Sequence, residues 1–181
     1  MYYIFGGNAM IFAEHVKNSL LSLIHEMASF PWLFVKNPAA DFSRSSKLDF
    51  ASTIQFILSM ESGSLKKELL DYFQFSVDTP SVSAFSQQRN KLLLETFLFL
   101  LHEFNSLFPL QKNYNGYRLL ACDGSDLNIP RNPKDADTYF QSLPTDKGFN
   151  QIHLNALYDL REKRYTDVVI QPARKKMNPL Q

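Results

Sequence analysis

The chain has 181 residues, of which 45% are apolar, so it is long and apolar enough for one ordinary domain or two small ones and is not disordered by composition. Lys and Arg number 19 against 18 Asp and Glu, which excludes a DNA-binding surface produced by net charge and leaves only local clustering. The single Cys122 excludes an internal disulfide, and no uncharged apolar run approaches the ~20 residues that cross a bilayer, so we expect a soluble cytoplasmic protein without a membrane partner.

A helix is predicted over residues 10–29, where apolar side chains recur at helical spacing. It should end at Phe30-Pro31, because a residue that precedes proline is disfavoured in the α conformation. After a loop, a second helix is expected over about 48–60, and Gly63 follows it. Ser64 is placed to cap a third helix over 65–74.

A fourth helix is predicted from the cap at Thr79-Pro80-Ser81 to about residue 108, and its two halves differ. From Leu92 to Phe104 it is apolar nearly all round, which predicts burial. Its first half is polar, so this half is expected to present its side chains to a partner or to solvent. Two short helices, a turn and a polar helix resemble a helix-turn-helix element, whereas a solvated face of a helical bundle is the alternative. The candidate DNA contacts are Ser86, Gln87, Arg89, Asn90 and Lys91.

Beyond residue 110 the apolar period changes from helical to alternating, which predicts β-strands. Strands are expected at 117–123, 151–159 and 165–172, with a charged hairpin turn between the last two. We place the domain boundary in the polar stretch 111–116. The predicted fold is therefore α+β, with a helical region over 1–110 and a sheet region over 111–181.

Asp123 is predicted to stand at the end of the first strand, where a sheet would fix its backbone and leave the carboxylate accessible. A carboxylate in this position can help to hold Mg²⁺, and a pair of such ions can drive phosphodiester chemistry. The alternative is a turn, because Asp-Gly-Ser is also a good turn sequence. We expect Asp126 to have a turn or surface role and Asp159 and Asp167 to face solvent. His153 could approach Asp123 if the strands pair.

The longer segment YRLLACDGSDLNIPRNPKDADTYF, over 117–140, resembles the first catalytic block of DDE-type transposases of the bacterial superfamily typified by insertion sequence four. The later segments HLNALYDL and YTDVVIQPARKKMN, and the helical segments before residue 92, follow the order of that group, so that the resemblance covers about 40–178. It implies a ribonuclease-H-like core that cuts and joins DNA at transposon ends with Mg²⁺ or Mn²⁺. Asp123 takes the place of the first of three catalytic acids, and the full-length protein would act as a homodimer.

The sequence departs from that group because no candidate for the second Asp or the final Glu precedes Gln181. One carboxylate holds hard cations poorly, so we expect a catalytically incomplete, truncated core that does not transpose by itself. Two other functions stay open. One is a non-enzymatic DNA-binding module or inhibitor, supported by Arg44, Lys47, Lys66 and Lys67, and the other is a helical interaction protein.

Overall fold

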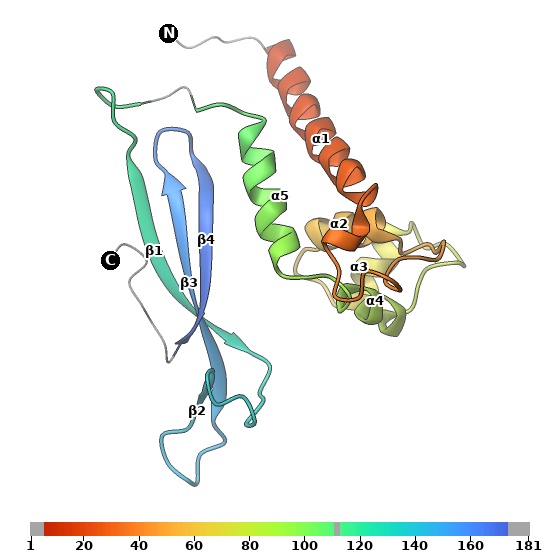
Figure 1. Ribbon diagram of the computed structural model, residues 1–181, viewed down its shortest axis with the longest axis vertical. Helices are drawn as coiled ribbons and strands as arrows, with labels where there is room; N and C mark the ends of the chain where they lie inside the picture. Colours follow the sequence, from red (N-terminus) through yellow and green to blue (C-terminus); the bar gives the residue numbers. More distant parts are fainter. Residues whose placement is uncertain (1–5, 111–112, 174–181) are drawn as a thin grey trace. The chain divides into compact units, whose positions relative to one another are not determined.

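The computed structural model describes residues 6–110 and 113–173, in which the chain forms five α-helices, a short 3-10 helix and four strands. It divides into two compact units, Met1–Leu107 and Phe108–Gln181, which are coloured from red to green and from green to blue in Figure 1. Positions 111 and 112 of the expected boundary, and 174–178 of the transposase resemblance, lie outside the described residues.

The helical unit contains every helix of the described chain (Figure 1). Side-chain oxygens cap three of them: Asp49 accepts from the Ser52 N–H, Ser64 from the Lys67 N–H and Ser81 from the Ala84 N–H. The cap predicted at Ser64 is therefore confirmed. The elements are α1 Gly6–Ala28, the 3-10 helix Pro31–Leu33, α2 Phe50–Ser59, α3 Leu65–Tyr72, α4 Val82–Arg89 and α5 Glu95–Ser106.

The prediction of one continuous fourth helix is wrong. The chain leaves the helix after α4, because Val35 and Leu92 form an antiparallel bridge. The Lys36 N–H donates to the Lys91 carbonyl at 2.8 Å and the Leu93 N–H to the Phe34 carbonyl at 3.0 Å, which replaces helical hydrogen bonds. All-round burial is also wrong, since Leu94 is 78% exposed.

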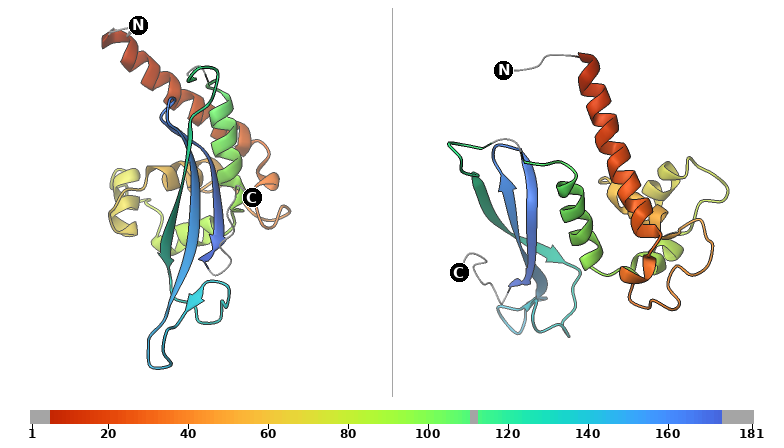
Figure 2. Two further views of the ribbon diagram at one scale, coloured as in Figure 1. Left: turned by 90° about the vertical axis from the view of Figure 1, so that its left-hand side faces the viewer. Right: turned by 45° about the horizontal axis from the view of Figure 1, so that its top comes forward.

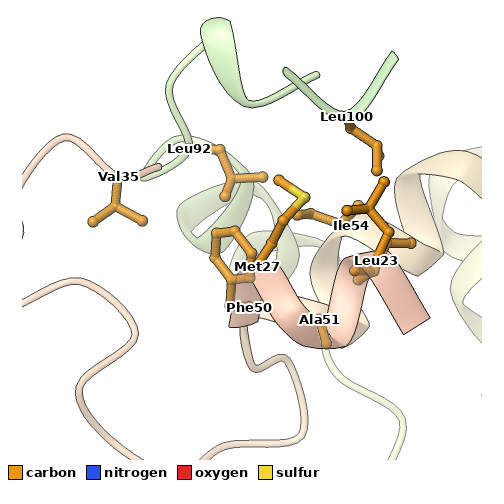
Figure 3. Packing of buried hydrophobic residues seen from close by; sticks show 9 residues of the cluster. Leu23, Met27, Val35, Phe50, Ala51, Ile54, Leu92 and Leu100 are labelled. Atoms are coloured by element: carbon orange, nitrogen blue, oxygen red, sulfur yellow. The ribbon is translucent and has the colours of Figure 1, made fainter. Parts of the chain in front are cut away.

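Two apolar clusters hold the helical unit together. The first joins α1, α2, α5 and the bridge, and Figure 3 shows its side chains converging. Its buried members are Leu23, Ile24, Met27, Val35, Phe50, Ala51, Ile54, Leu92 and Leu100. The second joins α2, α3 and α4 through Leu48, Phe56, Leu69 and Phe85, with the Phe56 and Phe85 rings edge to face at 4.6 Å between centroids.

The second unit is an antiparallel sheet around one central strand. Its strands are β1 Leu120–Ile129, β2 Tyr139–Phe140, β3 Phe149–Asp159 and β4 Arg164–Pro172. The β3 strand pairs with β1 along one edge and with β2 and β4 along the other. Asn150 of β3 shows this arrangement, because it pairs with Ile129 of β1 and with Tyr139 of β2. The predicted hairpin of the last two strands is confirmed. The expected start of a ribonuclease-H-like core remains a prediction.

The long segment between β1 and β3 is organised by one buried amide, that of Asn150. Its Oδ1 accepts from the Asn132 N–H at 2.6 Å, and its Nδ2 donates to the Asn132 carbonyl at 3.0 Å and to the Thr138 hydroxyl at 2.8 Å. A buried polar group is tolerable when its hydrogen bonds are satisfied, so Asn150 fixes this segment against the sheet.

Truncating Phe56 should destabilise the helical unit, because its fully buried ring contacts α3 and α4. We expect Phe56→Ala to cost about 3–5 kcal/mol of unfolding free energy, measured by denaturant titration with helical circular dichroism. Leu58→Ala in the same helix is the control, since Leu58 is 48% exposed. Equal losses in the two variants would contradict the assigned core.

Candidate carboxylate site and nucleic-acid interface

Asp123 lies inside β1 and not at the end of a strand, so both the strand-end and the turn predictions for Asp-Gly-Ser are wrong. Asp123 pairs with Ala156, Gly124 with Asn155 and Ser125 with Leu154 in an unbroken ladder. The pairing with β3 keeps the segment extended through Ile129, whatever its local turn preference. The Asp123 side chain is exposed on this rigid frame.

A second carboxylate, Asp167, lines the same hollow of about 250 Å³ as Asp123. The register of β3 and β4 shifts so that Tyr158 pairs with Tyr165 while Leu157 pairs with Asp167, which leaves Thr166 as an extra residue. Such a bulge re-aims neighbouring side chains. Asp167 is half-buried and accepts from the Val168 N–H at 2.8 Å. Alternation of inward and outward side chains along a regular strand does not predict that Asp167 lines the hollow. The sequence analysis therefore missed Asp167 as a site residue.

The hollow offers oxygen ligands, because Ser125 lines it together with the two carboxylate residues. Mg²⁺ and Mn²⁺ take such ligands together with water and phosphate oxygens. Among residues 6–110 and 113–173, however, no group of three or more His, Cys, Asp or Glu side chains is arranged to hold a metal ion. The described residues therefore do not fit the two-ion site that the transposase resemblance implies.

Asp126 and His153 form a pair on the opposite face of the sheet. They are cross-strand partners, and the His153 Nδ1 lies 2.7 Å from the Asp126 Oδ1. Gly124 leaves room for the imidazole, since a Cβ there would lie 2.8 Å from the His153 Nε2. Asp126 thus lies within β1 and not in a turn, and its cross-strand partner is in β3. His153 contacts Asp126 and not Asp123, because residues three apart in a strand face opposite sides.

Asp159 is fully buried at the β3–β4 turn, so the expectation that it faces solvent is wrong. Its Oδ1 accepts from the Arg161 and Glu162 N–H groups, both at 3.0 Å, and its Oδ2 pairs with the Arg118 guanidinium at 3.2 Å. The Glu162 N–H lowers the pKa of Asp159 most, the Arg161 N–H and Arg118 act in the same direction, and burial opposes them.

The five candidate DNA contacts lie on the last turns of α4 and immediately after it. Arg89, Asn90 and the Gln87 side chain are exposed, while Ser86 donates to the Val82 carbonyl at 2.8 Å. The Arg89 guanidinium lies over the Phe85 ring at 5.7 Å and the Lys91 ammonium over the Phe42 ring at 5.4 Å. Because α4 ends at Arg89, Asn90 and Lys91 lie beyond it, whereas the sequence predicts that all five residues belong to the first half of one long helix.

The supporting cations differ in availability. Lys47 pairs with Asp78 at 2.8 Å, and Lys67 pairs with Asp71 at 2.6 Å, a hydrogen bond that raises the pKa of Lys67. Arg44 and Lys66 form no ion pair within the described part of the chain. Arg44 and Lys66 are therefore better placed than Lys47 and Lys67 to meet an added phosphate.

Comparison of the chain with protein-family models, with curated proteins and with solved structures finds no match in any of the three. Within the described residues, no helix has the length and apolar character needed to span a bilayer. The transposase resemblance accordingly stays a prediction that rests on the order of sequence blocks.

Replacing Asp159 should weaken the β3–β4 hairpin in a pH-dependent way. Because its folded pKa lies below its ordinary value of 3.8, the carboxylate stabilises the sheet above that value and this contribution is lost as the pH falls through the lowered pKa. We expect Asp159→Asn to unfold at lower urea than the wild type at neutral pH, with the gap narrowing below about pH 4, followed by NMR signals of β3.

Asp123→Asn is the control for this titration, since it removes an exposed carboxylate from the same sheet. Asp123→Asn should unfold at the same urea concentration as the wild type at every pH. A gap for Asp159→Asn that is constant with pH would show that the buried charge is not what stabilises the turn.

Proposed function

We propose that the chain is the front portion of a DDE-type transposase, in which the helical unit binds DNA at transposon ends and Asp123 is the first catalytic acid. Two features support this proposal. Five α-helices precede an antiparallel sheet, and the long strands β1 and β3 are followed by β4, which forms a hairpin with β3. The observation that carries it is the position of Asp123, exposed on a paired strand in an open hollow with a second carboxylate.

The parent activity would be metal-dependent cleavage and strand transfer of DNA by a homodimer on paired ends. A complete set of acids in the parent protein would hold Mg²⁺ or Mn²⁺, and this ion would supply Lewis-acid activation of a nucleophile and of the leaving oxygen. In this chain Asp123 would supply one ligand to such an ion, and Asp167 lies close enough to line the same hollow. Since the described residues offer no third acid there, we propose that this chain is catalytically incomplete.

DNA binding would rest on the turn after α4. Arg89 and Lys91 are the phosphate contacts, and Ser86, Gln87 and Asn90 can reach base edges. The C-terminal end of a helix carries a partial negative charge that repels phosphate. The two cations at this end of α4 therefore have to dominate the local field, and binding should be strongly dependent on salt.

A non-enzymatic DNA-binding module, acting as an inhibitor at the same ends, is the second candidate. It is favoured because the described residues offer no third acid beside Asp123 and Asp167, and because this function needs only the helical unit. The two candidates share the DNA-binding surface and differ only in whether a complete metal site forms in the parent protein.

Duplex DNA should bind at low salt, and the Arg89→Gln/Lys91→Gln double variant should bind more weakly. Each lost phosphate contact lowers the slope of log affinity against log salt by about 1, so the double variant should lose about 2. Fluorescence anisotropy with labelled duplexes over a salt series measures this slope.

Lys67→Gln is the matched control for charge, because its ammonium already pairs with Asp71. Lys67→Gln should keep the wild-type slope of log affinity against log salt. The neighbouring variant Lys66→Gln should have a smaller slope if the DNA-binding surface extends to α3. Absence of binding at low salt, or equal slopes for wild type and double variant, would refute DNA binding by this surface.

A further inference from the structure

The helical unit carries an apolar hollow, the α4–α5 hollow, where the chain passes from α4 to α5 through the non-helical turn seen in Figure 2. Its volume of about 580 Å³ lies within the roughly 300–1,000 Å³ of small-molecule sites. The apolar walls come from α2, the turn and α5, and consist of Ile57, Leu92, Leu93, Leu94 and Phe97. Since Leu94 is 78% exposed, an apolar occupant would cover surface that now faces water.

Hydrogen bonds hold the walls of the α4–α5 hollow in place. The Lys36 N–H donates to the Lys91 carbonyl at 2.8 Å, and the Leu93 N–H donates to the Phe34 carbonyl at 3.0 Å. At the start of α5 the Thr96 hydroxyl donates to the same Phe34 carbonyl at 2.9 Å. The hollow is therefore formed before an occupant enters it, which lowers the conformational cost of binding.

The charged residues around the hollow favour an anion that carries a single charge. Lys36 and Arg89 line it together with one acid, Glu95, so two positive charges and one negative charge leave a net charge of +1. Within residues 6–110 and 113–173 none of the three forms an ion pair. Asn90 adds an amide that can donate a hydrogen bond. A carboxylate matches this charge, whereas a phosphate monoester carries a charge of about −2.

We propose that the α4–α5 hollow binds an amphipathic carboxylate, a small molecule whose apolar chain ends in a carboxylate. The chain lies against Ile57, Leu93 and Phe97, and the carboxylate approaches Lys36 and Arg89. Burial of the chain supplies most of the affinity, because an exposed ion pair contributes little, and the two cations set the orientation. This site goes beyond the proposed DNA binding and does not rest on it, since neither the apolar walls nor the charges require a nucleic acid.

NMR titration of the isotope-labelled full chain with octanoate, kept below the concentration at which it forms micelles, tests the site. We expect saturable shifts that concentrate at Lys36 and at residues 92–97. Octylammonium has the same apolar chain and the opposite charge. It should bind at least about threefold more weakly than octanoate, because the net charge of the lining attracts one head group and repels the other.

Two substitutions separate the apolar and the charged parts of the site. Leu94→Glu should weaken octanoate binding at least about tenfold, because it places a second carboxylate beside the bound chain. Lys36→Gln should weaken it about two- to fivefold and should reduce the preference for octanoate over octylammonium. Val77→Glu and Lys17→Gln are the matched controls, since both residues are exposed and lie outside the hollow. The two control variants should bind octanoate as the wild type does.

Circular dichroism establishes that each variant keeps the wild-type helix content before it is titrated. Four results would each overturn the proposal. They are the absence of saturable shifts in the wild type, shifts that concentrate outside the hollow, octylammonium binding as tight as octanoate binding, and a folded Leu94→Glu variant that binds octanoate as tightly as the wild type. The first three results involve only the unmodified chain, so the proposal stays testable whether or not a variant folds.

Discussion

The bridge between Val35 and Leu92 is the contact on which the helical unit depends. Two backbone hydrogen bonds flank it, from Lys36 to Lys91 and from Leu93 to Phe34, and they take the chain out of a helical path that its composition favours. Their formation buries Leu92 in the first core cluster and lets the Thr96 hydroxyl donate to the Phe34 carbonyl at 2.9 Å. The bridge thus sets where α4 ends and α5 begins.

The position of the candidate DNA-binding residues and the apolar hollow between α4 and α5 both follow from that break. If α4 and α5 were one helix, Arg89 and Lys91 would lie on nearly opposite sides of it, because they are two positions apart. As it is, they project from a helix end and a turn, packed over the rings of Phe85 and Phe42. The same turn exposes Leu94 and forms the wall of the apolar hollow. The candidate DNA-binding residues and an apolar hollow therefore adjoin at one turn of the chain.

In the sheet unit the corresponding constraint is the buried Asp159, which joins the β3–β4 turn to Arg118 ahead of β1. It holds the hairpin against which β1 stays extended through Asp123. The sheet accordingly presents one face with the Asp123 and Asp167 hollow and the other with the Asp126–His153 pair. Two carboxylates in a rigid hollow are a partial site for a hard cation, which agrees with the proposal of an incomplete catalytic core.

Local signals in the sequence predicted what local physics decides. Helical periodicity, the Ser64 cap and the alternation of β3 and β4 appear where they were expected. The errors concern contacts between residues far apart in the chain. The Val35–Leu92 bridge overrides helix propensity, and the pairing with β3 overrides the turn preference of Asp-Gly-Ser. Asp167, next to a register shift, lines the same hollow as Asp123. The burial of Asp159 likewise depends on Arg118, 41 positions away.

NMR mapping of a DNA complex tests the central claim most directly, that the turn after α4 is the nucleic-acid surface. A short duplex would be titrated into the isotope-labelled full chain at low salt. The account predicts that amide shifts concentrate at residues 86–91, with smaller changes near Lys66, and that β1 around Asp123 is unaffected. Shifts concentrated on the sheet, or none at all, would contradict it.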